Sequence, residues 1–246
     1  DVLYRNREGM GFVDVAREAG IVEQKFSQGV SAGDLDNDGF TDLYIANLGG
    51  NRLFLNRGDG TFQEITHDSG VGHPEWTTSC AIADLDGDGA PDLYDATFLT
   101  GADVFQMICE DAAGRKRSCA PAGFNAAPDY VWFSRGDGTF ENRTKSAGFD
   151  LPNGDGLGIL IADLNDSGRP QVFVANDGRA NFLFVPDPVA PGTPTSHWTE
   201  SAVAQGCAVD EVGQAQACMG IAANDFDGDG SQDFFVTNFF YESNTL

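Results

Sequence analysis

Short apolar runs separated by turn residues recur along the whole chain. Three examples are LYIAN at 43–47, RLFLN at 52–56 and QVFVAN at 171–176, all rich in aromatic and branched side chains. Gly, Asn and Asp cluster between the runs, and these residues favour tight turns. Such runs are typical of short β-strands. No segment offers ten or more residues with an apolar period of 3.6, so the pattern predicts an all-β protein.

One phrase of the pattern occurs four times. It reads DLDNDGFTDLYIAN, DLDGDGAPDLYDAT, DLNDSGRPQVFVAN and DFDGDGSQDFFVTN, beginning at Asp34, Asp84, Asp163 and Asp225. A second phrase follows two of these units, as RLFLNRGDGTFQEIT and YVWFSRGDGTFENRT. Each unit offers four short strands with tight turns between neighbours, which describes one blade of a β-propeller. We therefore expect residues 1–246 to form a single β-propeller domain or propeller segment of about four repeat units.

Two stretches interrupt the repeat, and both ends of the chain cut through it. The inserts at 101–128 and 186–220 are interpreted as excursions from a blade rim. The chain begins with the third and fourth strands of a unit and ends with the first two. The preferred expectation is three whole blades and two partial ones within a larger propeller. The alternative is a closed four-bladed ring, in which Val2–Val15 pairs with Ile221–Asn238 in one sheet.

The first phrase also carries candidate metal ligands in the spacing D-x-D-x-D-G-x-x-D. Calcium takes six to eight hard oxygens at about 2.3–2.6 Å, from carboxylates and backbone carbonyls. Carboxylates so close together repel one another unless a cation lies among them. The expected ligands, with a carbonyl at the seventh position of each loop, form three sets: Asp34, Asp36, Asp38, Phe40 and Asp42; Asp84, Asp86, Asp88, Ala90 and Asp92; Asp225, Asp227, Asp229, Ser231 and Asp233. A solvated acidic turn is the alternative.

The loop that begins at Asp163 departs from this spacing. Asn165, Ser167 and Gln171 stand where the other loops have carboxylates. We expect this loop to hold no ion and to be closed by side-chain hydrogen bonds instead. Calcium at three sites is therefore the predicted cofactor.

The charge of the chain excludes one class of partner. The 246 residues include 38 acidic and 14 basic ones, a formal net charge of −24. Phosphate backbones would be repelled, so nucleic acid is not an expected partner. No apolar run approaches the roughly 20 residues of a membrane-spanning helix. The first residues show no signal-peptide pattern, so an export signal would have been removed or lie outside these residues.

Five cysteines leave one unpaired. Cys109 and Cys119 bracket one polar segment, and Cys207 and Cys218 bracket another. Zinc binding is the rival interpretation, but no CxxC spacing occurs and no His completes a site. We predict two loop disulfides, and hence an extracellular, cell-surface or periplasmic protein. Cys80 aligns with apolar strand positions and is expected to be a buried thiol.

These motifs carry a family resemblance. The calcium-type loops resemble those of the FG-GAP/VCBS repeat proteins, which form calcium-binding propellers. The phrases LGILIADLNDSGRPQVFVANDGRANFLF and DEVGQAQACMGIAANDFDGDGSQDFFVTNFFYESNTL look like the cartilage-acidic-protein-like branch, which is associated with an ASPIC/UnbV segment. The resemblance covers essentially the whole chain. It implies an exported calcium-binding propeller with an interaction or scaffold role.

Several other signals have a structural interpretation that outweighs a functional one. The RGD tripeptides at 57–59 and 135–137 lie where the turn needs Gly and Asp regardless of any partner. Asn142 and Asn165 match glycosylation acceptors only in a eukaryotic secretory pathway. The basic cluster at 115–117 is interpreted as a solvated loop rather than a contact for an anionic partner. The histidines are expected in surface turns or loops: His67, His73 and His197.

Three function classes remain after these exclusions. The leading hypothesis is a non-enzymatic protein-interaction or scaffold module whose partner surface is a propeller face built by the two inserts. A calcium-dependent lectin is the first rival, because Trp76, Trp132 and Trp198 are candidate stacking platforms, although Trp132 is expected to pack inside a blade. An enzyme that uses a propeller face or an inter-blade cleft is the second. No catalytic constellation and no GxSxG or HExxH motif is visible in the sequence.

Overall fold

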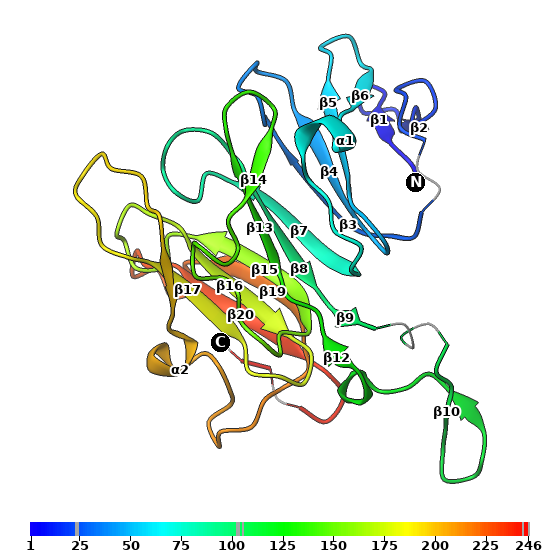
Figure 1. Ribbon diagram of the computed structural model, residues 1–246, viewed down its shortest axis with the longest axis vertical. Coiled ribbons are helices and arrows are strands. Elements are labelled where there is room, and N and C mark those ends of the chain that lie inside the picture. The colour runs from blue at the N-terminus through cyan, green and yellow to red at the C-terminus, as the bar shows by residue number, and fades with distance from the viewer. Residues whose placement is uncertain (23–24, 102–103, 105, 243, 246) are drawn as a thin grey trace.

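The chain folds into an arc of antiparallel sheets, described here by a computed structural model (Figure 1). The structure describes residues 1–22, 25–101, 104, 106–242 and 244–245. Successive sheets lie side by side through their first strands, because β3 contacts β7, β7 contacts β15 and β15 contacts β19. This is the packing of propeller blades around an axis, so the predicted all-β propeller architecture is confirmed.

Three of the sheets are complete four-stranded blades. Blade 1 contains, in spatial order, β3 (Ser27–Gly33), β4 (Asp42–Asn47), β5 (Arg52–Asn56) and β6 (Phe62–Glu64). Blade 2 contains β7 (Thr77–Ala83), β8 (Asp92–Thr97), β13 (Tyr130–Ser134) and β14 (Phe140–Asn142). Blade 3 contains β15 (Gly156–Ala162), β16 (Gln171–Asn176), β17 (Phe182–Pro186) and β18 (Trp198–Glu200).

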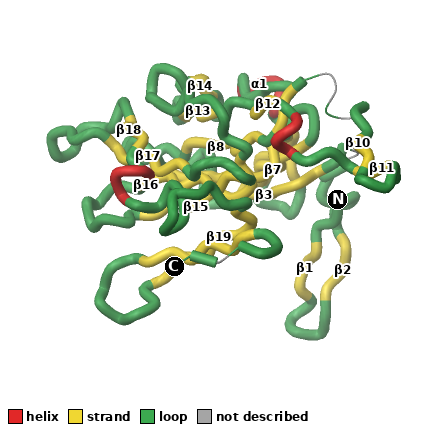
Figure 2. Tube along the Cα trace, turned by 90° about the horizontal axis from the view of Figure 1, so that it is seen from below, coloured by secondary structure: helices red, strands yellow, loops and turns green. Residues whose placement is uncertain are grey.

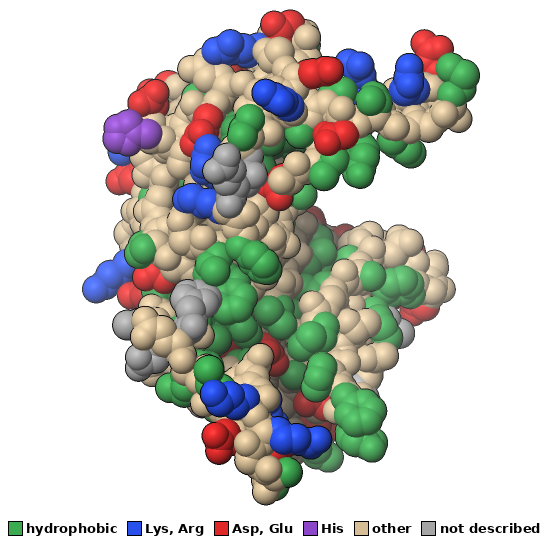
Figure 3. Space-filling view, turned by 90° about the vertical axis from the view of Figure 1, so that its right-hand side faces the viewer, with side chains coloured by type: hydrophobic (Ala, Val, Ile, Leu, Met, Phe, Trp, Pro, Cys, Tyr) green, Lys and Arg blue, Asp and Glu red, His purple; other side chains and the backbone are tan. Residues whose placement is uncertain are grey.

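Two half-blades stand at the ends of the arc. The N-terminal one pairs β1 (Tyr4–Asn6) with β2 (Phe12–Asp14), and the C-terminal one pairs β19 (Cys218–Asn224) with β20 (Asp233–Asn238). Among the described residues, no ladder joins the two half-blades, and Figure 2 shows β1–β2 and β19 at separate places along the lower part of the view. The space-filling view shows the resulting hollow between two arms (Figure 3). The arc is open, so the chain does not form the closed four-bladed ring.

The helices and the remaining strands lie in the connections. Two one-turn helices, α1 (Thr66–Ser69) and α2 (Ala202–Gln205), follow the last strands of blades 1 and 3. The excursion from blade 2 contains β9 (Leu99–Thr100), β10 (Cys109–Glu110), β11 (Lys116–Arg117), the 3₁₀ turn at Pro121–Gly123 and β12 (Asn125–Ala126). Residues 102–103 and 105 of this insert lie outside the described residues.

The hydrophobic core lies between blades rather than within one sheet. Leu53 of blade 1 packs in one cluster with Leu93 and Trp132 of blade 2. A second cluster joins blade 2 to blade 3 around Phe149 and Trp198. Burial at these seams supplies the hydrophobic term that fixes the angle between neighbouring sheets.

Glycine allows the first strands of neighbouring blades to approach one another closely. A Cβ at Gly29 would lie 3.0 Å from the Thr78 carbonyl oxygen, and one at Gly156 would lie 3.0 Å from the Ala96 Cβ. Both glycines lie at a register irregularity in the first strand of their blade. The Thr78 hydroxyl then donates to the Gly156 carbonyl across the seam, at 2.6 Å. Gly29 and Gly156 therefore serve blade packing.

Candidate metal centre

The predicted metal-binding loops join the first strand of a unit to the second. Residues 34–42, 84–92 and 225–233 connect β3 to β4, β7 to β8 and β19 to β20. The sixth residue of each loop is a glycine with a positive φ, at 90° for Gly39, 93° for Gly89 and 95° for Gly230. A side chain is strained at such a φ, so glycine is required for the chain to turn back on itself here.

Each loop gathers carboxylate groups. In every group the candidate ligand atoms lie within 4.8 Å of one another. The groups are Asp34, Asp36 and Asp42; Asp84, Asp86 and Asp92; Asp225, Asp227 and Asp229. The grouping omits three of the predicted carboxylate ligands, Asp38, Asp88 and Asp233.

The fifth residue of each loop accepts a hydrogen bond from the backbone amide two positions later. Asp38 Oδ1 accepts a hydrogen bond from the Phe40 amide at 2.8 Å, and Asp88 Oδ1 accepts one from Ala90 at 2.8 Å. Asp229 makes the same bond to Ser231, at 2.7 Å, yet remains in its group. These bonds hold the seventh residue of each loop, the predicted carbonyl ligand, against the preceding turn.

The ninth residue of each loop is tied to the blade behind it. Asp42 accepts the amides of Leu35 and Asn56, both at 2.7 Å. Asp92 accepts those of Leu85 at 3.0 Å and Ser134 at 2.9 Å. Because β5 supplies the Asn56 donor and β13 supplies the Ser134 donor, the carboxylate at the ninth position of these two loops is fixed by the blade and not only by the loop.

Burial, with a smaller contribution from neighbouring carboxylates, raises the pKa of four aspartates in loops 34–42 and 84–92: Asp36, Asp42, Asp86 and Asp92. Desolvation, followed by the charge of Asp38, raises the pKa of Asp36 above its ordinary value. Desolvation raises the pKa of Asp92 to about 7, with a smaller contribution from neighbouring carboxylates, against the effect of the two amide bonds. A divalent cation among the carboxylates would offset both effects, since it favours the charged form.

The residues present fit calcium. The grouped donors are all oxygens, as a hard cation requires, and no sulfur or imidazole takes part. In two loops, carboxylates at the first and third positions lie within 4.8 Å of the fixed ninth residue. Such a site would neutralise clustered charge and hold a turn in place; its chemistry is that of a structural ion rather than an acid–base centre.

The loop at 163–171, by contrast, is closed by its own side chains. The Gln171 amide nitrogen donates to Asn165 Oδ1 at 3.0 Å, to Ser167 Oγ at 3.4 Å and to the Arg169 carbonyl at 2.8 Å. Gln171 Oε1 accepts the Leu164 amide at 2.6 Å, as Asp42 accepts Leu35 in blade 1. These are the side-chain hydrogen bonds that the sequence analysis expects. The amide nitrogen bonds to oxygens at the third, fifth and seventh positions, where the other loops would hold the ion.

A buried polar cluster between blades 1 and 2 was not identified from the sequence. Asp95 is fully buried, and its Oδ2 accepts hydrogen bonds from the Tyr44 hydroxyl and the Trp132 indole, each at 2.9 Å. His73 Nε2 lies 3.2 Å from the same oxygen, and its Nδ1 lies 3.5 Å from Glu75. His73 lies in a loop, as expected, but it is buried rather than exposed to solvent. The available signal was Asp95 itself, which replaces an apolar residue of the repeated phrase, where Ile45 and Val174 stand in other blades.

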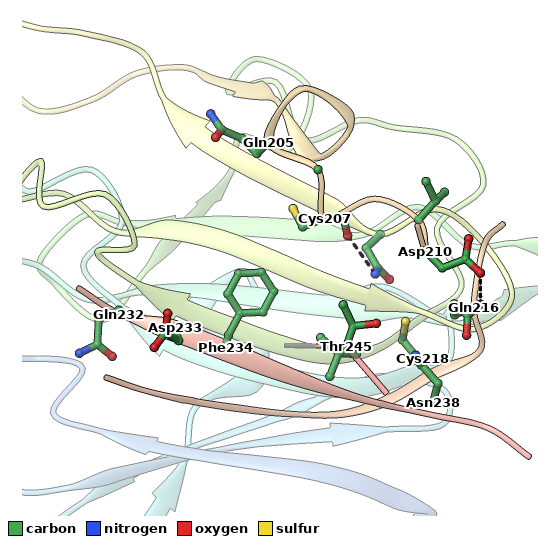
Figure 4. Close-up of a pocket in the computed structure, with 14 residues that line it drawn as sticks. Gln205, Cys207, Asp210, Gln216, Cys218, Gln232, Asp233, Phe234, Asn238 and Thr245 are labelled. Atoms are coloured by element: carbon green, nitrogen blue, oxygen red, sulfur yellow. Dashed lines mark hydrogen bonds between the residues drawn. The ribbon is translucent and has the colours of Figure 1, made fainter. Parts of the chain in front are cut away.

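The cysteines confirm one predicted disulfide and contradict the other. Cys109 and Cys119 are joined, with Cα atoms 5.0 Å apart. Cys207 and Cys218 are free thiols that line one cavity of about 280 Å³ (Figure 4). Asn181 lies between them: its amide donates to the Cys207 carbonyl at 3.2 Å, and its bond to the Cys218 thiol opposes the increase in pKa that burial causes. Cys80 is buried, as expected for a structural thiol.

The two inserts share one face only in part, because the second insert divides between the two ends of the blades. The excursion 101–128 follows the end of β8, opposite the metal-binding loops. The segment 187–197, between β17 and β18, lies on the side of these loops, because the Thr195 amide donates to the Asp86 carbonyl at 2.8 Å. The rest of the second insert returns through α2 to the opposite side (Figure 1). The strand β18 runs from the side of the metal-binding loops to the opposite side, and it separates the two parts of the second insert.

Two of the candidate stacking tryptophans are inaccessible. Trp132 is 4% exposed and Trp198 is fully buried, so neither presents a face to a sugar. Trp76 is half-buried, packs edge-on against Phe98 and lines a cavity of about 240 Å³. In the basic cluster, Arg115 pairs with Asp111 at 2.8 Å and is largely solvent-exposed, in agreement with a solvated loop.

The comparisons with known proteins agree with the repeat. The FG-GAP-like repeat family matches residues 34–94, which include two of the metal-binding loops. Human cartilage acidic protein 1 is 39% identical over 58 residues, which are 24% of this chain and 9% of that protein. A solved structure described as specific recognition of non-reducing terminal N-acetylglucosamine by an Agrocybe aegerita lectin is similar with a TM-score of 0.47 and 18% identity, over 96% of this chain and 54% of that chain. The chain thus spans a small part of the first relative and about half of the second.

None of the helices among the described residues has the length and apolar character needed to cross a membrane.

Proposed function

We propose that this chain is a calcium-binding β-propeller segment of an exported protein and that it acts as a non-enzymatic interaction or scaffold module. One observation carries the calcium assignment. The same loop brings carboxylates within 4.8 Å of one another in three units, at the same place in each blade. Solvated acidic turns would not be expected to repeat this close grouping of carboxylates in three loops, because their charges would spread apart. Calcium in these loops would stabilise the blades and take part in no reaction.

Export is supported by the redox chemistry of the chain and by its similarity. The Cys109–Cys119 disulfide is typical of an oxidising compartment. The partial match to cartilage acidic protein 1 supports the finer proposal that the chain belongs to the cartilage-acidic-protein-like branch.

The proposed interaction surface lies at the end of the blades opposite the calcium loops. Connections at this end expose large apolar side chains, which soluble proteins otherwise keep scattered and few. They include Ile108 at 62%, Val212 at 71%, Phe240 at 71% and Tyr241 at 94% exposed. Long connections that carry exposed apolar groups are common sites of protein recognition. A protein partner therefore fits this surface better than a glycan does, given the burial of Trp132 and Trp198.

Calcium titration by calorimetry tests the proposal, together with thermal melts in calcium and in chelator. The expected stoichiometry is three ions per chain. An ion at about ten times its dissociation constant adds roughly 1.4 kcal/mol, so three sites add about 4 kcal/mol to the free energy of unfolding. A melt that chelation does not shift would contradict the calcium assignment. Saturable binding on a glycan array would instead favour the lectin.

A further inference from the structure

The three carboxylate loops are supported to different degrees by their surroundings. In loop 84–92 the Asp86 side chain is buried, at 6% exposed, whereas its counterpart Asp227 is exposed. Both neighbouring blades contact this loop. Asn37 of blade 1 donates to the Gly89 carbonyl at 3.1 Å, and Thr195 of blade 3 donates its amide to the Asp86 carbonyl at 2.8 Å.

The contact from blade 3 is itself held in place. Thr195 is 1% exposed. The Arg169 guanidinium donates to the Thr195 hydroxyl through Nη1 and to the Thr193 carbonyl through Nη2, at 2.8 Å. One planar cation thus fixes two points of the 187–197 segment, and this segment positions the backbone of Asp86.

Arg169 belongs to the loop that the Gln171 amide closes. It occupies the seventh position, where Phe40, Ala90 and Ser231 stand in the carboxylate loops. Its carbonyl accepts the Gln171 amide at 2.8 Å, so its backbone is fixed without an ion. The side chain can therefore extend toward the neighbouring blade from a rigid base.

A second arginine approaches the same aspartate. Arg143 Nη1 lies 3.5 Å from Asp86 Oδ2, and its guanidinium stacks on the Phe133 ring at 4.0 Å. This ion pair restrains the Asp86 side chain. Asp86 is thus restrained at both its backbone and its side chain.

We propose that Arg169 and Thr195 are positioning residues for the calcium loop of blade 2, and that loop 84–92 binds calcium more tightly than loops 34–42 and 225–233. The inference rests on the proposed calcium function. Rigidity and outer-shell hydrogen bonds tune calcium affinity, because a ligand that is already ordered loses less entropy on binding. Removal of such partners typically weakens metal affinity about 10- to 100-fold.

Calorimetric titration with calcium chloride tests this on the whole chain. Arg169→Ala should weaken the tightest of the three sites by about tenfold and leave the other two unchanged. Thr195→Val keeps the amide donor and loses only the hydroxyl, so its effect should be smaller. Arg135→Ala is the control, since Arg135 lies in the turn between β13 and β14 of blade 2, outside the metal-binding loops, and pairs with the exposed Glu141. It should leave all three affinities unchanged.

A variant of the ligand identifies the site. Asp86→Asn should abolish the tightest site, and Arg169→Ala should then have no further effect on the remaining two. Folding of each variant is checked by its melt in saturating calcium, and Thr195→Val replaces Arg169→Ala if the latter does not fold. If the parent binds three ions and the tightest affinity is unchanged in Arg169→Ala and Thr195→Val, the inference is wrong while the proposed function stands. The same holds if Asp86→Asn loses one of the weak sites instead of the tightest one. A parent chain that binds no calcium would instead overturn the proposed function.

Discussion

Blades 2 and 3 share a strand order and a loop backbone, yet they fill matched positions with opposite chemistry. Blade 2 has carboxylates at Asp92 and Asp129, where blade 3 has the amides Gln171 and Asn181. The ninth residue accepts the amide of the second in both loops, at 3.0 Å for Asp92 and 2.6 Å for Gln171. The backbone geometry therefore does not require a carboxylate. What changes is the centre of the loop, which gathers negative charge in blade 2 and is closed by a neutral N–H donor in blade 3.

This difference indicates that the backbone geometry maintains the repeat, and that the proposed calcium ion would be one of two ways to stabilise the loop. Clustered carboxylates leave repulsion that an external cation must offset. The Gln171 amide supplies hydrogen-bond donors within its own loop, so this loop needs no cation and is not expected to gain stability from calcium. One chain thus combines blades that are expected to respond to calcium with one that is not.

The largest expected effect comes from giving blade 3 the charge of blade 2. Gln171→Glu keeps the side-chain length and the acceptor for Leu164 but replaces the amide donor by a buried anionic oxygen. Three hydrogen bonds are lost, and the new charge faces Asn165 Oδ1 and the Arg169 carbonyl. We expect the free energy of unfolding to fall by about 2–3 kcal/mol in chelator, from urea titration.

The control for that experiment is Gln63→Glu in blade 1. Gln63 is exposed, and its oxygen accepts Arg57 Nη2 at 3.0 Å, a bond that a glutamate retains. The control should therefore remain within about 0.5 kcal/mol of the parent. A Gln171→Glu variant as stable as this control would show that the amide does not close the loop.

The second effect compares the two loops within one sample. Hydrogen exchange followed by mass spectrometry reports local opening of each loop with and without calcium. Chelation should increase exchange in 84–92 about tenfold, since an ion at about ten times its dissociation constant contributes roughly 1.4 kcal/mol. Exchange in 163–171 should not change, because Gln171 replaces the ion there. Equal acceleration in both loops would contradict the distinction between the two blades.

The sequence predicted the repeated parts of the molecule better than the parts that occur once. The strands and carboxylate loops follow a spacing that recurs, so each copy supports the interpretation of the others. His73 lies outside the repeated phrases, and its burial depends on Asp95 and Trp132, which are distant in sequence. Local spacing contains no information about such tertiary contacts.

The disulfides show the same limit. Both cysteine pairs bracket short polar segments, and by spacing alone they looked equivalent. In the structure, β10 pairs with β11 and Cys109 lies opposite Arg117, close enough to reach Cys119. Cys218 instead begins β19 and opposes Asn238, with Asn181 between it and Cys207. Strand pairing, and not sequence separation, decides which thiols meet.

The smallest effect concerns Asp129, a buried carboxylate of blade 2 at a position where blades 1 and 3 have the amides Asn51 and Asn181. Asp129 accepts the Thr97 amide at 2.8 Å and the Tyr94 hydroxyl at 2.9 Å, whereas in blade 1 an amide, Asn51, accepts Asn47 and donates to Tyr44. Desolvation raises the pKa of Asp129 to about 7, although these hydrogen bonds oppose it. The folded state therefore binds a proton that the unfolded state has released above about pH 4.

The sign of the pH dependence follows from that proton. Between about pH 4 and pH 7 the folded state holds more protons than the unfolded state, so the contribution of Asp129 to stability decreases as pH rises, and it is constant above pH 7. Asp129→Asn removes this dependence and places in blade 2 the residue that blades 1 and 3 already use. In urea titrations at saturating calcium, the free energy of unfolding of the variant relative to the parent should increase by about 1 kcal/mol from pH 5 to pH 6, since one proton contributes at most about 1.4 kcal/mol per pH unit. Asn181→Asp should introduce the same downward slope into blade 3. If the Asp129→Asn difference is flat between pH 5 and pH 7, Asp129 does not carry a proton in the folded chain, and the charge contrast between the two blades is confined to their loops.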